Sequence, residues 1–182
     1  MMQTTLCYIE LGGCYLMLHR TKKENDVNHD KWIGVGGKFE ANEAPEECLL
    51  REAREETGLL LTHYTYRGLL TFLYNDKEPE YIFTYTADGF VQSGTGYGKA
   101  ASSVQNPVFP ASLPDCREGV LEWVSKNRID RLTLWEGDHL LFRLLQENRS
   151  VPFSLKMRYR GDDLLEALEL SEGVRILKPM RA

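Results

Sequence analysis

The chain has 182 residues, of which 42% are hydrophobic and 27% charged, and its formal net charge is −5 at pH 7. This length and composition predict a single domain, spanning residues 1–182, with a substantial core. The negative charge and the lack of a basic tract argue against binding to a nucleic-acid polymer. No apolar run approaches the ~18 residues that a membrane span needs, and the first residues lack the pattern of a signal peptide.

The four cysteines are scattered through the sequence and show no C-x-x-C spacing. This distribution is typical of reduced thiols in a cytoplasmic protein. We therefore expect a cytoplasmic chain without a disulfide framework.

The first elements are two β-rich runs, residues 3–10 and 13–20, which meet at two consecutive glycines. A two-residue glycine turn between such runs predicts a hairpin. The polar loop 21–30 follows, and Arg20 and Lys23 near its start either face substrate phosphates or are solvated. Residues 31–36 are predicted to form a strand.

The segment after residue 44 has the signals of a helix with one acidic face. Pro45 suits the first helical position and Gly58 the residue after the last turn. Spacings of three and four residues place Glu52, Glu55 and Glu56 on the same face. Two carboxylates ~6 Å apart repel by about 3 kcal/mol at an effective dielectric near 20. Such a face is either a solvated helix surface or a site for a hard divalent cation.

The middle of the chain is predicted to form a second hairpin, with strands at 59–75 and 80–87 and a turn between them. The stretch 89–117 is rich in Gly, Ser and Pro and has no periodicity. A segment of this length is either a mobile insert or an ordered lid.

The last third repeats the mixture of strands and a helix. A strand is predicted at 118–125 and a helix at 136–147, where leucines recur with a helical period. Strands are predicted at 152–160 and 164–170, the second with a helical turn as its alternative. The residues after 173 are expected to form a loosely tied tail.

This order of elements predicts an α/β or α+β fold, with a mixed sheet and the two helices on opposite sides of it. The motif within it is more specific. Gly37, Glu43 and the run REAREETGL from Arg51 to Leu59 resemble the Nudix box of the Nudix hydrolases. Every fixed Gly, Glu and Arg of that pattern is matched, which chance would give about once in 10^8 starting points. The resemblance implies an α/β/α sandwich around a mixed β-sheet.

The resemblance also implies a Mg²⁺-dependent enzyme, with Mn²⁺ as an alternative ion, that splits a pyrophosphate bond. Mg²⁺ binds through a few carboxylates, screens phosphate charge and activates the attacking water. By the resemblance, Glu52 or Glu55 is the general base. Glu43 and Arg51 form a structural ion pair that holds the loop against the helix, and Gly58 is a further structural residue of the box. Glu118 is a further candidate base or ligand. The metal ligands would come from Gly37, Glu52, Glu55, Glu56 and Glu118.

Beyond the box, the chain resembles the Nudix subgroup that hydrolyses oxidised purine nucleoside triphosphates such as 8-oxo-dGTP. By this resemblance Trp135 stacks on the base and Asp138 hydrogen-bonds its edge; such stacking is worth about 1–3 kcal/mol per base. Plain core packing is the alternative role of each aromatic residue. The substrate-binding set would be Trp32, Ile33, Lys38, Phe72, Tyr74, Tyr81, Trp135, Asp138, Arg20 and Lys23.

Three positions depart from that subgroup. Ile33 stands where the subgroup has an asparagine that reads the purine, Gly137 replaces one of two neighbouring acids, and Glu136 replaces a proline. The leading hypothesis is hydrolysis of a nucleoside triphosphate to the monophosphate and pyrophosphate. The alternatives are hydrolysis of ADP-ribose or a dinucleoside polyphosphate, or a nucleotide-sensing domain without turnover. The sequence assigns no oligomeric state.

Overall fold

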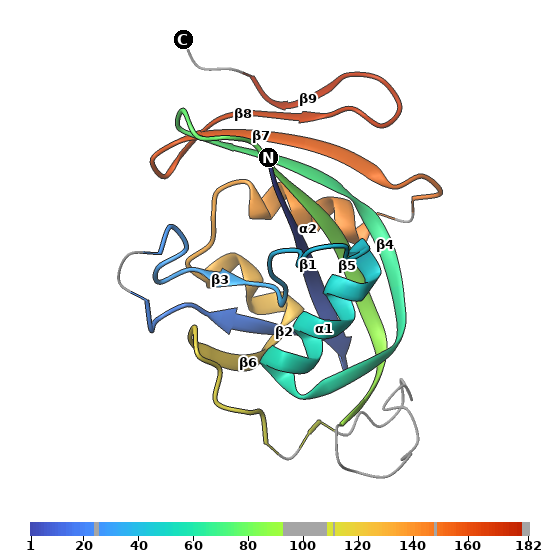
Figure 1. Ribbon diagram of the computed structural model, residues 1–182. Helices are drawn as coiled ribbons and strands as arrows, with labels where there is room; N and C mark the ends of the chain where they lie inside the picture. The colour runs from blue at the N-terminus through green and yellow to red at the C-terminus, as the bar shows by residue number, and fades with distance from the viewer. Residues whose placement is uncertain (24–25, 93–108, 111, 148, 180–182) are drawn as a thin grey trace.

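The computed structural model describes residues 1–23, 26–92, 109–110, 112–147 and 149–179. Within this part of the chain, nine strands, two α-helices and one 3₁₀ helix follow one another (Figure 1). In chain order they are β1 (Met2–Leu11), β2 (Cys14–His19), β3 (Trp32–Ile33), α1 (Pro45–Thr57), β4 (Leu59–Tyr74), β5 (Glu80–Gln92), β6 (Val120–Ser125), η1 (Lys126–Arg131), α2 (Asp138–Gln146), β7 (Phe153–Arg160), β8 (Asp163–Glu169) and β9 (Arg175–Lys178).

The described strands form one mixed sheet in the order β3-β2-β1-β5-β4-β7-β8-β9, and β6 pairs with β2 off this path. The β1–β5 and β4–β7 pairs are parallel. The other strand pairs are antiparallel. The predicted mixed sheet is therefore confirmed.

The two helices cover opposite faces of this sheet (Figure 1). The alternation of β1 shows how: Tyr8 belongs to the hydrophobic cluster beneath α2, and Cys7 and Ile9 belong to the cluster beneath α1. Successive strand residues point to opposite faces, so one strand supplies both cores. The predicted α/β/α sandwich is confirmed.

Helix α1 begins and ends where the sequence predicts. The poor N-cap residue, Ala44, is compensated by Glu47, whose carboxylate accepts a hydrogen bond from the Ala44 N–H at 2.8 Å. Gly58 ends the helix with φ 69°, and its N–H donates to the Arg54 carbonyl oxygen at 2.9 Å. The buried face of the helix includes Leu49 and the small Ala53, which allows close packing on the sheet.

The strand predicted at 31–36 is wrong in its length, because β3 covers only two residues. Val35 and Lys38 make isolated bridges to Cys7 and Thr4 of β1 instead. The chain passes so close to β1 that a Cβ on Gly36 would overlap the Thr5 carbonyl oxygen. The segment that leads into α1 is thus held against β1 by single contacts rather than by a full ladder.

Other boundaries also differ from the predictions. β5 runs to Gln92, so residues 89–92, which were predicted to begin a loop, belong to a strand. Residues 93–108 and 111 of the predicted loop lie outside the described part. α2 begins at Asp138, two residues after its predicted start. The segment predicted at 164–170 is the strand β8 and not a helical turn, since its residues pair with β7.

The predicted loose tail is wrong over residues 175–178. These residues form β9, which pairs antiparallel with β8, and Leu177 packs against the cluster beneath α2. Pairing satisfies the free edge of β8, which would otherwise expose unpaired backbone groups.

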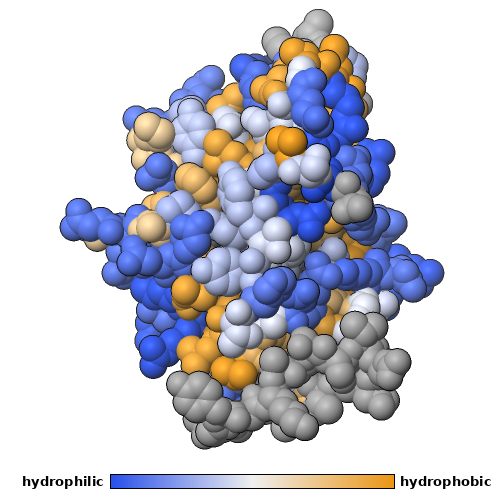
Figure 2. All heavy atoms as spheres, turned by 90° about the vertical axis from the view of Figure 1, so that its right-hand side faces the viewer, coloured by the Kyte–Doolittle hydropathy of each residue, from blue (hydrophilic) through white to orange (hydrophobic). Residues whose placement is uncertain are grey.

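The molecular face in Figure 2 is largely hydrophilic, with hydrophobic side chains in separate groups. Among the described residues, none of the helices combines the length and the apolar character that crossing a bilayer requires.

Candidate functional site

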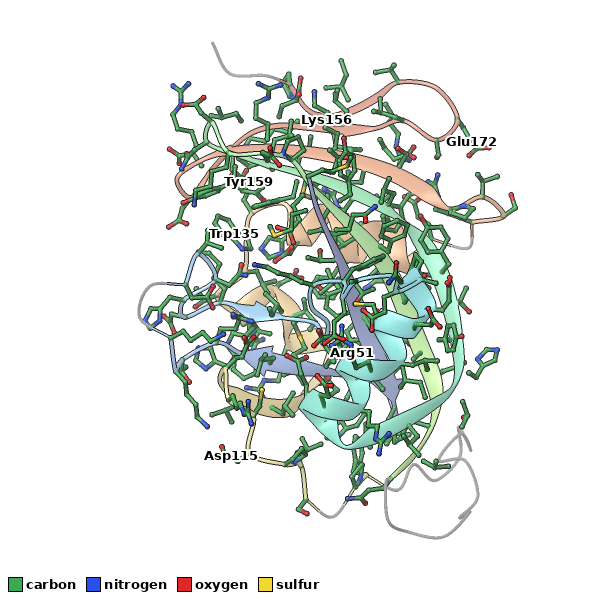
Figure 3. All side chains as sticks on the ribbon, viewed as in Figure 1. Arg51, Asp115, Trp135, Lys156, Tyr159 and Glu172 are labelled. Carbon is green, nitrogen blue, oxygen red and sulfur yellow. The ribbon has the colours of Figure 1, made fainter. Side chains whose placement is uncertain are left out.

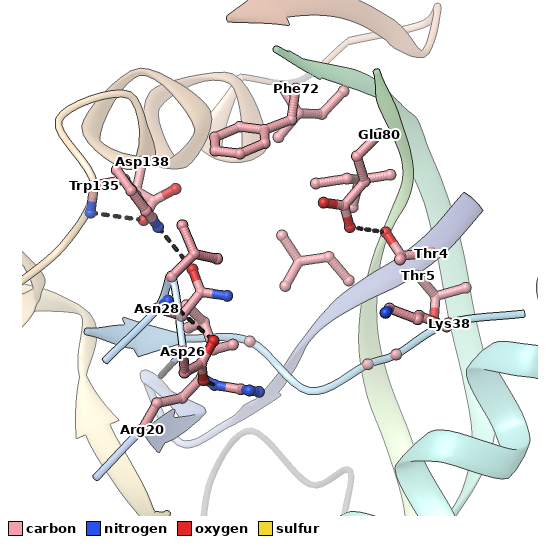
Figure 4. Close-up of a pocket in the computed structure, with 18 of the residues that line it drawn as sticks. Thr4, Thr5, Arg20, Asp26, Asn28, Lys38, Phe72, Glu80, Trp135 and Asp138 are labelled. Carbon is pink, nitrogen blue, oxygen red and sulfur yellow. Dashed lines mark hydrogen bonds and ion pairs between the residues drawn. The ribbon is translucent and has the colours of Figure 1, made fainter. Parts of the chain in front are cut away.

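A cavity of about 660 Å³ lies between the acidic face of α1 and the start of α2 (Figure 4). Strands β1, β4, β5 and β7 contribute its walls, and the segments around residues 26–28 and 33–38 complete it. The two ends of the cavity differ in chemistry. We call the part lined by Glu52, Glu56 and Glu118 the acidic end, and the part lined by Phe72, Trp135, Asp138 and Tyr159 the aromatic end.

At the acidic end, two glutamates of α1 face the loop that precedes the helix. The Glu56 carboxylate accepts a hydrogen bond from the Gly36 N–H at 3.1 Å. Gly37 lies directly against the carboxylate of Glu52, which would have to move if residue 37 carried a Cβ. The Gly37 carbonyl oxygen accepts the Thr5 N–H at 2.9 Å and the Cys48 thiol at 3.6 Å.

The carboxylates of the acidic end are incompletely compensated. Burial raises the pKa of Glu56 to about 8 despite the Gly36 hydrogen bond, and the charges of Glu52 and Glu118 contribute to the same shift. Burial also raises the pKa of Glu52, against the hydrogen bond and charge of Arg51. Desolvated carboxylates that repel one another favour a proton or a cation.

Arg51 organises the other side of the helix. Its guanidinium binds both carboxylate oxygens of Glu43, at 2.6 and 2.9 Å, and donates to Glu52 at 2.7 Å. The same group donates to the Lys38 carbonyl oxygen at 3.0 Å, so it ties the loop to the helix. The Arg51 hydrogen bonds lower the pKa of Glu43 to about 2. Glu55 contacts Arg51 at 3.4 Å, its side chain is 60% exposed, and it does not line the cavity.

Glu118 lies at the same end but is paired with cations. Arg20 and Lys23 both donate to its carboxylate, and Arg20 also binds Asp26. The two basic residues line the cavity. They face carboxylates of the protein here, so any phosphate contact would require them to exchange partners.

Among the described residues, no three His, Cys, Asp or Glu side chains are close enough to form a ready metal cluster. The donor chemistry nevertheless fits a hard divalent ion, because Glu52 and Glu56 are partly buried oxygen donors whose pKa values are raised. Arg51 and Arg20 hold Glu52 and Glu118, respectively, in ion pairs with the protein.

At the aromatic end, other aromatic rings surround the indole of Trp135, a residue that is only 6% exposed. The ring of Tyr159 lies 5.0 Å from the indole and that of Phe72 5.8 Å, both nearly perpendicular to it. The indole N–H donates to the side-chain oxygen of Asn28 at 2.8 Å. The ammonium group of Lys31 lies 4.3 Å from the indole centroid, within cation–π range.

Asp138 begins α2 and lines the same end of the cavity. Its carboxylate accepts the Trp135 backbone N–H at 3.2 Å. Burial raises the pKa of Asp138 to about 7, although that hydrogen bond and the charge of Lys31 act in the opposite direction. The neighbouring Gly137 donates its N–H to the Tyr159 hydroxyl at 2.7 Å, and a side chain at residue 137 would run into Met157 and Tyr159. This explains the glycine at 137, where the sequence suggested a missing acid.

The remaining predicted substrate residues divide into two groups. Ile33 and Lys38 line the cavity. Trp32, Tyr74 and Tyr81 are not part of its lining. Trp32 stacks on His19 with a centroid distance of 4.5 Å, and Tyr74 stacks on Phe72 at 6.1 Å.

Several lining residues were not found by sequence reasoning. Asn28 lies in a polar loop without periodicity and gave no signal. Glu80 begins β5 and accepts a hydrogen bond from the Thr4 hydroxyl at 2.8 Å. Tyr159 continues the buried series Phe153, Leu155 and Met157 at a spacing of two along β7, so this period could have placed it in the interior.

Comparisons with known proteins agree with this architecture. A family model of the NUDIX domain matches residues 4–143. The uncharacterized Nudix hydrolase YvcI of Bacillus subtilis (strain 168) is 28% identical over 144 residues, which span 76% of each chain. The crystal structure of the MutT protein from Bacillus halodurans has a TM-score of 0.71 and 22% identity, covering 98% of this chain and 100% of that one. A bifunctional NMN adenylyltransferase/ADP ribose pyrophosphatase from Francisella tularensis has a TM-score of 0.54 and 20% identity, covering 81% of this chain and 41% of that one.

Proposed function

We propose that this chain, which belongs to the Nudix hydrolase family of enzymes acting on pyrophosphate bonds, is a Mg²⁺-dependent nucleoside triphosphate pyrophosphohydrolase. It would release the nucleoside monophosphate and pyrophosphate. The cavity carries this proposal, because it joins partly buried carboxylates at one end to aromatic side chains at the other. Its volume of about 660 Å³ lies within the usual range for small-molecule sites.

The acidic end would hold the divalent ion, Mg²⁺ or alternatively Mn²⁺. Glu52 and Glu56 are the proposed ligands that line the cavity. Gly37, which lies against Glu52, would add its carbonyl oxygen if that oxygen exchanged its Thr5 and Cys48 partners for the ion. Glu55 and Glu118 complete the proposed set, once Arg51 and Arg20 release them. A bound ion screens phosphate charge and lowers the pKa of the attacking water.

The side chains of the protein itself supply positioning and proton transfer. Glu52 is the favoured general base over Glu55, because it lines the cavity whereas Glu55 is 60% exposed on the outer side. Its carboxylate accepts the proton of the attacking water. Lys38, Arg20 and Lys23 bind phosphate oxygens, since displacement at phosphorus depends on positioning and charge stabilisation.

The aromatic end would hold the base. Phe72 and Trp135 provide ring surface, and Asp138 provides a hydrogen-bonding carboxyl group. A purine, including an oxidised one such as that of 8-oxo-dGTP, is the substrate we propose. The cytoplasm, where nucleotides and free thiols occur together, is the proposed location.

Hydrolysis of ADP-ribose is the second candidate. The structural similarity to the Francisella tularensis protein, which is described as an ADP ribose pyrophosphatase, supports it at the level of the fold. The two candidates release different products, because ADP-ribose gives AMP and ribose phosphate but no pyrophosphate.

The test is incubation of the protein with Mg²⁺ and a panel of nucleoside triphosphates, 8-oxo-dGTP and ADP-ribose, with the products separated by chromatography. We expect monophosphate and pyrophosphate from a purine triphosphate, and no release without the metal. Cleavage of ADP-ribose together with intact triphosphates would contradict the proposal.

A further inference from the structure

The last three strands of the sheet lie beyond the stretch of the chain that the family model matches. That match ends at residue 143, whereas β7, β8 and β9 begin at residues 153, 163 and 175. In Figure 1 these strands form the upper edge of the molecule, above α2. We call them the C-terminal extension. The extension is part of the cavity, because Met157 and Tyr159 of β7 line it.

The register of β7 places these two side chains beside the aromatic end. β7 pairs in parallel with β4, and Met157 lies opposite Phe72. Alternate residues of a strand share one face, so Met157 and Tyr159 point to the side of the sheet on which Trp135 lies. The ring centroids of Tyr159 and Trp135 are 5.0 Å apart. Both β7 side chains are only 1% exposed, so they form the inner wall of the cavity rather than its mouth.

Met157 occupies space that a side chain at residue 137 would need. A Cβ on Gly137 would lie 2.4 Å from the Met157 sulfur and 2.9 Å from its terminal methyl group. The Tyr159 hydroxyl lies on the same side and accepts the Gly137 N–H at 2.7 Å. The start of α2 therefore supplies only backbone at this point, and the extension supplies the side chains that bound the cavity.

Two ion pairs also tie the extension to the segments that carry the aromatic end. Asp162, in the turn between β7 and β8, pairs at 3.3 Å with Lys31 in the loop before β3. Lys178 of β9 pairs with Glu136, two residues before α2 begins. Together with the Tyr159 hydrogen bond, these contacts fix the wall relative to the rest of the cavity.

We propose that the C-terminal extension sets the size limit for the base that the cavity accepts, and that Met157 is the specificity-determining residue. An unsubstituted purine fits against the thioether, whereas a purine with an alkyl group on the edge that meets Met157 overlaps with it. Protein interiors are close-packed, so a wall that is buried on its far side does not yield without cost. This inference rests on the proposed function, because it concerns which nucleotides the same cavity takes.

The test is the variant Met157→Ala, which removes the thioether and opens the wall. The substrates are ATP, GTP, N6-ethyl-ATP, O6-ethyl-GTP and N2-ethyl-GTP, because the three ethyl groups sample different positions of the purine edge. We expect the wild-type protein to discriminate in kcat/KM against at least one ethyl derivative. We expect Met157→Ala to raise that ethyl-to-parent ratio by about tenfold or more, since a single methylene in an apolar pocket can change kcat/KM by that factor.

Met17→Ala is the matched control. Met17 is also fully buried in the cluster beneath α2, but it does not line the cavity. This variant should lose stability as Met157→Ala does, with no change in the ethyl-to-parent ratio. An equal rise in both variants would mean general loosening of the core and would overturn the role of Met157. If Met157→Ala does not fold, Met157→Val, which leaves a smaller void, is measured against the same criterion.

Binding of GMP, AMP and their ethyl derivatives, measured by isothermal titration calorimetry, separates this inference from the proposed function. Hydrolysis of triphosphates with the same ethyl-to-parent ratios in the wild type and Met157→Ala, or equal use of ethyl and parent substrates by the wild type, overturns the size limit and leaves the function standing. Tighter binding of an ethylated monophosphate to Met157→Ala than to the wild type, without any hydrolysis, overturns the function and supports the size limit. Neither binding nor hydrolysis overturns both.

Discussion

The two ends of the cavity are built in different ways. The acidic end comes chiefly from one short segment, since Gly37, Glu52 and Glu56 belong to α1 and the loop before it. The aromatic end is assembled from segments far apart in sequence, because Asn28, Phe72, Trp135 and Tyr159 meet only when the sheet has formed. Figure 3 shows Arg51 on α1 well separated from Trp135 and Tyr159, which lie near each other.

The ends also differ in how they treat buried charge. The charge of Glu118 opposes the ionisation of both Glu52 and Glu56, and the charge of Glu52 opposes that of Glu56, so the acidic end favours a cation. At the aromatic end, Asp138 is a buried acid that has Lys31 as its cationic neighbour. The charges of the first end therefore support the proposed metal and phosphate site, and those of the second end support the proposed site for a neutral ring.

The largest effect is expected from Glu52→Gln and Glu56→Gln, which remove charge from the acidic end alone. We expect kcat to fall by about 100- to 10,000-fold, the usual contribution of a general base or a lost electrostatic contact. GMP binding should change little, because the aromatic end is intact. Steady-state kinetics with Mg²⁺ and calorimetry with GMP measure the two effects.

Glu47→Gln is the matched control, since it makes the same substitution on the same helix at a residue that only caps Ala44. Glu55→Gln should also reduce turnover, but less than Glu52→Gln, because its side chain is exposed. Wild-type turnover in Glu52→Gln and Glu56→Gln would refute the metal site.

The contrast between the ends explains how much the sequence could predict. The helical period and the end signals of α1 are local, so the positions of Glu52, Glu56 and Gly58 follow from the sequence. The pairing of Glu118 with Arg20 joins residues 98 positions apart and leaves no local pattern. The same holds for Asn28 and Trp135, which are 107 positions apart.

The boundaries of the strands were also hard to predict from the sequence, because they depend on pairing with distant segments. The short β3 could not be told from a longer strand, because Val35 has a β-type side chain and its single bridge to Cys7 depends on the position of β1. β9 was missed because its short sequence is stabilised by pairing with β8 rather than by its own propensity.

The next largest effect is expected from Asp138→Asn, which tests the aromatic end through the pH dependence of the free energy of unfolding. The pKa of Asp138 is raised to about 7 in the folded protein and is near 3.9 when unfolded, so the folded state binds the extra proton between these values. Its contribution is fully present below about pH 4 and is lost as the pH rises to 7, by up to about 4 kcal/mol. Asp138→Asn should remove this slope.

Denaturant unfolding of the wild type and Asp138→Asn at several pH values between 4 and 7.5 measures the difference in slope. Asp76→Asn, at an exposed turn residue, should retain the wild-type slope. Parallel curves for the wild type and Asp138→Asn would show that the pKa of Asp138 is the same in the folded and unfolded states and would contradict this prediction.

Gly137→Ala tests how closely the start of α2 packs against β7 at the aromatic end. The φ of Gly137 is −71°, so alanine causes no backbone strain, but its Cβ would run into Met157 and the Tyr159 hydroxyl. We expect a loss of about 1–3 kcal/mol in the free energy of unfolding from this overpacking. In a Tyr159→Phe background the loss should be smaller, because the hydroxyl is absent. An equal loss in both backgrounds would exclude Tyr159 as the cause.

Trp135→Phe gives the smallest effect and isolates the aromatic end from the chemistry. Phenylalanine keeps a ring but lacks the N–H that orients Asn28, so KM for a purine triphosphate should rise about tenfold with little change in kcat. Trp123→Phe is a demanding control, because the Trp123 indole nitrogen is buried without a hydrogen-bond partner among the described residues. Its loss should leave KM unchanged. A fall in kcat alone in Trp135→Phe would mean that the aromatic end acts on the reaction step, and the division of labour between the two ends would be wrong.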